Sequence, residues 1–116
     1  MPHRLAHVVV DCADPELLAA FWAAALGVAI DHRFEQYVFL AATADGGPAL
    51  AFQRVPEPKL GKNRLHLDLV VDDLATAVAE LVALGARHVA SVDEQGVRLE
   101  VLADPEGNEL CVIPAG

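Results

Sequence analysis

The chain has 116 residues and a formal net charge of −9, and 54% of its residues are hydrophobic while 22% are charged. This composition is typical of one packed globular domain and excludes a disordered chain. The excess of 17 acidic over 8 basic residues argues against partners such as nucleic acid or an anionic membrane. No stretch approaches the roughly 18 apolar residues of a membrane span, and the first residues have no signal-peptide layout, so we expect a cytoplasmic protein.

The first module covers residues 1–55 and is predicted to contain a strand, a helix and three more strands. The first strand spans Arg4–Val10, and the helix begins after Asp14, a residue that caps helix N-termini well. Apolar residues recur with helical spacing up to Leu26, and Gly27 suits the left-handed conformation that ends a helix. Three strand-like runs follow: Val28–Arg33, Tyr37–Ala42 and Ala49–Val55.

The second module covers residues 64–116 and repeats this order after a linker over residues 56–63, which contains two prolines and a glycine. Its helix is expected to be capped by Asp72 or Asp73 and to end at Gly85. Its predicted strands are Arg64–Val71, Arg87–Val92, Val97–Leu102 and Glu109–Ile113. The sequence therefore predicts a single α+β domain made of two βαβββ modules.

One histidine stands at the same place in each module. His7 precedes Gly27 by 20 positions, and His66 precedes Gly85 by 19. Such a near-repeat of about 58 residues indicates two copies of one supersecondary unit, in which a pseudo-twofold axis would relate the histidines. Strand alternation places His66 and Asp68 on the face opposite the neighbouring leucines. His3, His32 and His88 have no such repeat partner, and we interpret them as surface residues.

The two cysteines, Cys12 and Cys111, do not form a disulfide framework. If Cys111 shares a site with His7, strand geometry puts Cys12 roughly 16 Å further along. Both cysteines are therefore expected to be reduced thiols.

Paired βαβββ modules with a histidine on each first strand resemble the vicinal oxygen chelate superfamily, which includes glyoxalase I, bleomycin-resistance proteins and extradiol dioxygenases. Three segments are similar to the small glyoxalase-like domain proteins: Phe52–Lys59, Asn63–Leu69 and the closing stretch Asp104–Val112. The resemblance implies that the modules form a cupped, eight-stranded mixed sheet, a half-barrel with the helices outside. It also implies a homodimer.

In metal-dependent members of this superfamily, the first and last strands of each module supply the ligands of one divalent ion. The resemblance therefore implies metal ligands at His7 and His66, at Gln53 or Phe52, and at Cys111. Glyoxalase I carries a glutamate at the position of Cys111, where it serves as ligand and base, and this difference argues against a typical lactoylglutathione lyase. Extradiol dioxygenases need an iron site made of two histidines and one carboxylate, and the missing carboxylate argues against that chemistry too.

Two functions remain open at this point. The first is binding or transformation of a small oxygenated metabolite, with lyase or isomerase chemistry assisted by zinc, nickel, iron or manganese on His7 and His66. Asp68 or Glu109 would then move the proton as catalytic residues. Either Glu109 or Glu100 could supply the missing carboxylate if the strand register differs from the alignment. The second is a metal-free, drug-sequestering protein like the bleomycin-resistance proteins. The incomplete ligand set favours a metal-free pocket over a bound ion.

Overall fold

The computed structural model describes residues 2–115, and the chain divides into two compact units, Met1–Lys59 (unit 1) and Leu60–Gly116 (unit 2). The boundary between them falls within the segment 56–63 that the sequence predicts as a linker. Unit 1 contains β1 (His7–Cys12), α1 (Pro15–Leu26), β2 (Ile30–Phe34), β3 (Tyr37–Leu40) and β4 (Ala49–Arg54). Unit 2 contains β5 (Leu67–Val71), α2 (Leu74–Leu84), β6 (Arg87–Glu94), β7 (Val97–Ala103) and β8 (Glu109–Pro114).

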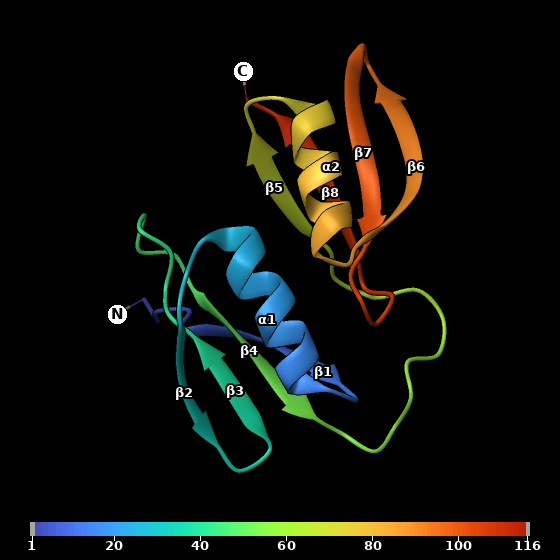
Figure 1. Ribbon diagram of the computed structural model, residues 1–116. Coiled ribbons are helices and arrows are strands. Elements are labelled where there is room, and N and C mark those ends of the chain that lie inside the picture. Colours follow the sequence, from blue (N-terminus) through green and yellow to red (C-terminus); the bar gives the residue numbers. More distant parts are fainter. Residues whose placement is uncertain (1, 116) are drawn as a thin grey trace. The chain divides into compact units, whose positions relative to one another are not determined.

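Both units have the same sheet topology, with a helix against the sheet (Figure 1). The strand order is β1-β4-β3-β2 in unit 1 and β5-β8-β7-β6 in unit 2. The first strand of each unit pairs in parallel with the last, and the other neighbours are antiparallel. The predicted α+β class with two βαβββ modules is confirmed, and each module is a four-stranded mixed sheet. In the described part of the chain, neither helix is long and apolar enough to span a membrane.

The helix boundaries follow the caps that the sequence predicts. Asp14 precedes α1, and its Oδ1 accepts a hydrogen bond from the Leu17 backbone N–H at 3.2 Å. Gly27 ends α1 with a φ of 68°, a conformation that other residues adopt only with strain. For α2 the cap is Asp73, whose Oδ2 accepts from the Thr76 hydroxyl at 2.6 Å.

The first strand of each unit begins later than predicted. β1 starts at His7 and β5 at Leu67, three residues after the predicted starts in both cases. Leu5 and Leu65 precede these strands and remain 67% and 76% exposed. Neither leucine is buried, so the apolar pattern in the sequence begins before the first residue that pairs in the sheet.

The Asp104–Asn108 turn explains why the closing motif marks the fold. The buried Asp104 carboxylate accepts hydrogen bonds from the backbone N–H groups of Glu106 and Asn108, both at 2.9 Å, and from the Asn108 side chain. Gly107 has a φ of 86°, which favours glycine. The motif therefore closes the β7–β8 hairpin by satisfying its own polar groups.

Candidate functional site

The exposed face of the unit 2 sheet brings three of the predicted site residues together. Asp68 on β5 lies directly beside Cys111 on the parallel strand β8. His66 precedes β5 by one residue and shares the face of Asp68 because side chains alternate along a strand. On the other face, Leu69 pairs with the fully buried Val112, as the predicted alternation requires.

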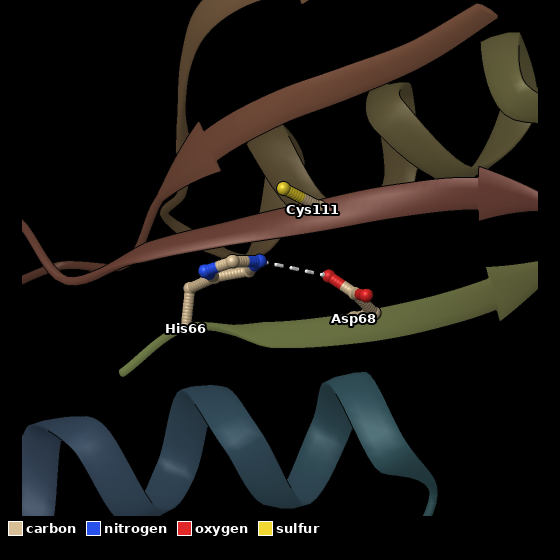
Figure 2. A group of neighbouring side chains, drawn as sticks. All are labelled: His66, Asp68 and Cys111. Atoms are coloured by element: carbon tan, nitrogen blue, oxygen red, sulfur yellow. Dashed lines mark ion pairs between the residues drawn. The ribbon is translucent and has the colours of Figure 1, made fainter. Parts of the chain in front are cut away.

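The side chains of His66, Asp68 and Cys111 converge (Figure 2). Each offers one ligand atom, and these atoms all lie within 4.8 Å of one another. His66 Nε2 lies 3.3 Å from Asp68 Oδ1, and both side chains are about half exposed. The group therefore holds an imidazole nitrogen, a carboxylate and a sulfur within reach of one small ligand.

The environment keeps Cys111 in its thiol form. Burial is the largest cause that raises the pKa of Cys111, and the Asp68 carboxylate adds to it by charge repulsion and by a hydrogen bond. The thiol is thus a weak nucleophile at neutral pH. A metal ion would have to displace its proton before sulfur could ligate.

The donor set of this group fits zinc. Zinc accepts histidine nitrogen, cysteine sulfur and carboxylate oxygen, and catalytic zinc sites have three protein ligands and one open position. Magnesium and calcium prefer oxygen ligands alone, so a thiol and an imidazole argue against them.

Glu109, a predicted catalytic residue, has other partners in unit 2. Its carboxylate binds the Lys62 ammonium group. Its backbone N–H donates to Asn63 Oδ1 at 3.1 Å. Glu109 is not a member of the group formed by His66, Asp68 and Cys111. Glu100 pairs in register with Val112, so it lies on the helix-covered face, and the hypothesis that it supplies the missing carboxylate beside His66 is wrong.

Gln53 and Phe52, the alternative predicted ligands on the last strand of unit 1, lie on opposite faces of β4. Phe52 is fully buried, whereas Gln53 is half-buried and shares its face with His7. However, His7 pairs with Ala49, and Gln53 pairs with Asp11 four residues further along. Four residues of strand correspond to roughly 13 Å, so this register does not bring His7 and Gln53 together.

An aromatic row covers the same face of unit 1, and sequence reasoning missed it. The His7 ring lies edge-on to Phe39 with centroids 5.3 Å apart, and the His32 ring stacks on Phe39 at 4.4 Å. The Tyr37 ring, two residues earlier on the same strand, also stacks on Phe39, with centroids 5.5 Å apart. His32 is exposed, as predicted, but it belongs to this row. The spacing of Tyr37 and Phe39 on one strand face is the signal that would have indicated it.

Both cysteines are free thiols, as predicted. Cys12 is buried in unit 1, and its Sγ lies 3.5 Å from the Gln53 carbonyl oxygen, to which it donates.

Comparisons with solved structures support the fold. A glyoxalase/bleomycin resistance protein/dioxygenase family enzyme from Burkholderia phytofirmans PsJN matches with a TM-score of 0.81 and 20% identity, over 97% of this chain and 98% of that one. A glyoxalase-related enzyme from Fulvimarina pelagi matches with 0.76 and 20%, over 98% and 89%. A lactoylglutathione lyase from Agrobacterium tumefaciens matches with 0.70 and 18%, over 98% and 95%. At these identities the likeness concerns the fold alone.

No curated protein matches the sequence significantly. The family model described as the glyoxalase-like domain matches residues 7–113, nearly the whole chain. The chain therefore belongs to the glyoxalase-like domain family of the vicinal oxygen chelate superfamily.

Proposed function

We propose that this protein binds and transforms a small oxygenated metabolite at the exposed face of the unit 2 sheet, with His66, Asp68 and Cys111 holding a zinc ion. The observation that carries the proposal is the convergence of three different ligand atoms within 4.8 Å. Bound zinc would supply Lewis-acid polarisation of a substrate carbonyl, which fits lyase or isomerase chemistry.

Asp68 has the central role among the residues of the chain. Its carboxylate faces the His66 imidazole at 3.3 Å and also interacts with the Cys111 thiol. It therefore orients both neighbours, and it is the carboxylate of this group that is available to accept a substrate proton. Glu109, which binds Lys62, is less suited to that role.

The same face offers apolar contact for a ligand. Val70 lies two residues beyond Asp68 on β5 and is 65% exposed. Small-molecule sites combine apolar walls with a few converging polar groups. An exposed valine beside the polar group supports binding of a metabolite that has a short carbon skeleton.

Zinc content after loading and exhaustive dialysis tests the proposal. We expect about one zinc ion per chain in the wild-type protein and loss of zinc in His66→Ala and in Cys111→Ser. Cys12→Ser is the matched control, because it removes the other cysteine from unit 1. Asp68→Asn replaces a charged ligand oxygen by a neutral amide oxygen and is expected to weaken zinc binding by at least about tenfold.

Two results would contradict this assignment. Zinc retained by both His66→Ala and Cys111→Ser would show that the ion binds elsewhere. Zinc lost from His7→Ala but not from Asp68→Asn would favour the ligand set that the superfamily resemblance implies, which includes His7 and not Asp68. If the zinc is retained as expected, turnover of carbonyl and diol compounds is then compared between wild type and Asp68→Asn.

A metal-free binding protein is the second candidate, and two observations favour it. The raised pKa of Cys111 opposes metal ligation, and the row of His7, Phe39 and His32 offers a stacking surface for a planar ligand. The net charge of −9 would attract a cationic aromatic drug. Thermal stabilisation by such a compound in the presence of a chelator, abolished by Phe39→Ala, would support this candidate.

We also propose that the two units form one domain and that the chain assembles into a homodimer. Exposed apolar residues in both units, including Phe34 and Val97, support burial by a further surface. Light scattering gives the mass in solution, and a single urea transition observed by several probes would support one cooperative domain.

A further inference from the structure

A cavity of about 430 Å³ lies between α2 and the neighbouring strands of unit 2. It is on the helix-covered side of the sheet, opposite the face that carries His66 and Cys111. Three apolar or small helix residues and three polar strand residues line it: Leu74, Ala75, Val78, His88, Arg98 and Glu100. Its volume falls in the range of small-molecule sites, roughly 300–1,000 Å³.

The helix positions that line the cavity are occupied differently in unit 1. When the two helices are aligned by their caps, Asp14 and Asp73, the lining residues Leu74, Ala75 and Val78 correspond to Pro15, Glu16 and Ala19. The Glu16 carboxylate binds Arg33 through two hydrogen bonds, whereas Ala75 has no polar side chain and borders the cavity. The same alignment matches the buried Trp22 with Leu81.

The sheet positions differ in polarity as well as in size. Val38 pairs with Phe52 in unit 1, and the corresponding pair in unit 2 is Glu100 with Val112. By the same register, Ile30 of β2 corresponds to His88 of β6. A hydrophobic core surface has been replaced by a carboxylate and an imidazole that border an open space.

The Glu100 side chain is only 11% exposed and is held by three donors. The Ser91 hydroxyl donates at 2.6 Å, His88 Nε2 at 2.7 Å and Arg98 Nε at 3.0 Å. The Ser91 hydrogen bond is the first cause that lowers the pKa of Glu100, so Glu100 is a carboxylate at neutral pH. Because a carboxylate can only accept hydrogen bonds, His88 must carry a proton on Nε2 to bond Glu100.

This network orients Arg98 and leaves part of it available. Among the described contacts, Arg98 uses its Nε alone, and its side chain is 63% exposed. The two terminal Nη groups of a guanidinium match the geometry of a carboxylate. Glu100 thus fixes the plane of a guanidinium whose other edge is free to bind an acceptor beside an apolar wall.

We propose that this cavity binds a small monocarboxylate with a compact aliphatic or aromatic body, whose carboxylate pairs with Arg98 while its body contacts Leu74 and Val78. A cationic ligand is disfavoured because Glu100 already accepts three hydrogen bonds. A phosphate dianion is disfavoured because Glu100 and the net charge of −9 repel a doubly charged group. The site does not depend on the metal group on the other face.

Amide correlation NMR spectra recorded during titration with benzoate test the proposal. We expect saturable shifts, up to about 10 mM benzoate, that are largest at Leu74, Val78 and Arg98. Benzamide, which has the same shape without the charge, is expected to bind at least about tenfold more weakly.

Variants then distinguish the pocket from a general charge effect. Arg98→Gln is expected to weaken benzoate binding about tenfold or more. Arg33→Gln is the matched control, because Arg33 also pairs with a glutamate, Glu16, but in unit 1 and through two hydrogen bonds. Val78→Phe, which fills the cavity from the helix, is expected to abolish the shifts and offers a second route if Arg98→Gln does not fold.

Three results of the titrations of wild type and Val78→Phe would each overturn the proposal. These are the absence of saturable shifts in the folded wild-type protein, shifts that map outside the cavity, and equal benzoate binding by wild type and Val78→Phe. Equal weakening by Arg98→Gln and Arg33→Gln would also overturn it, since only overall charge would then matter.

Discussion

The two units have the same topology, but they differ in the side chains that lie between the helix and the sheet. In unit 1, Trp22, Phe52 and Val38 are all buried, and Val38 pairs with Phe52 across the sheet. In unit 2 the equivalent positions hold Leu81, Val112 and Glu100, and a cavity of about 430 Å³ remains. The strand order, the parallel pairing of the first and last strands and the positions of the helix caps are shared, although the core residues differ. A carboxylate is tolerated in one core because its neighbours changed with it.

The exposed faces of the sheets differ as well. Unit 1 presents the aromatic row centred on Phe39, which suits stacking, whereas unit 2 presents the ligand group of His66, Asp68 and Cys111. The repeat supplied equivalent strands, and different side chains on them created different chemistry. The predictions below test how far the two helix–sheet interfaces are interchangeable.

The largest effect is expected when the glutamate of unit 2 is placed in unit 1. Val38→Glu buries a carboxylate at a position that is 2% exposed, where the cross-strand neighbour Arg33 is already bound to Glu16 through two hydrogen bonds. We expect a loss of about 3–5 kcal/mol in the free energy of unfolding, measured in urea. Val9→Glu is the control at an exposed valine of the same unit and is expected to cost less than about 0.5 kcal/mol. Equal losses would mean that burial is not the cause.

Truncation of the helix residue that faces the core should cost more in unit 1 than in unit 2. Trp22→Ala is expected to lower the free energy of unfolding by about 3–5 kcal/mol, and Leu81→Ala by about 2–3 kcal/mol. Both side chains are buried, but leucine is smaller than tryptophan and therefore has fewer contacts to lose. Urea unfolding monitored by circular dichroism compares the two variants, and a larger loss for Leu81→Ala would contradict this difference in packing.

Removal of the buried carboxylate from unit 2 should be comparatively mild. Glu100→Val restores the residue type of unit 1. The three donors that lose their acceptor, Ser91, His88 and Arg98, are exposed and can bond to water. We expect a loss of about 1–2 kcal/mol. A loss as large as that of Val38→Glu would show that the polar network is essential to the fold of unit 2.

The smallest effect concerns pH. The lowered pKa of Glu100 means that its ionised form stabilises the folded state above the ordinary value of 4.5, and that this stabilisation is lost as pH falls through the folded pKa. We therefore expect the stability difference between wild type and Glu100→Gln to be constant near neutral pH and to shrink below about pH 4.5. A constant difference down to pH 3, about where most carboxylates are protonated, would contradict the assignment.

Sequence patterns predicted the fold more completely than the site. The caps Asp14 and Gly27 and the repeated strand order are local signals, and the structure contains the predicted elements. The neighbourhood of Asp68 and Cys111 depends on strand register, which two distant segments set together. The same holds for Gln53. It lies on the same face of the sheet as His7, but its pairing partner, Asp11, is four residues further along β1.

The cavity below α2 was beyond sequence reasoning for a related reason. Glu100 stands in a strand of alternating residues, and this pattern alone does not reveal which face the helix covers. Its equivalence to Val38 becomes visible only when the pairing of both hairpins is known. His88, interpreted as a surface residue from the sequence, is half exposed and belongs to the Glu100 network.

The proposed function rests on the group formed by His66, Asp68 and Cys111, and anomalous diffraction at the zinc edge tests it most directly. Crystals of the wild-type protein soaked in zinc are predicted to show one strong anomalous peak per chain, bonded to His66 nitrogen, an Asp68 oxygen and Cys111 sulfur, at about 2.0–2.3 Å. Crystals of Cys111→Ser soaked identically should lose that peak. A peak that avoids these three side chains, or none in either crystal, would contradict the account.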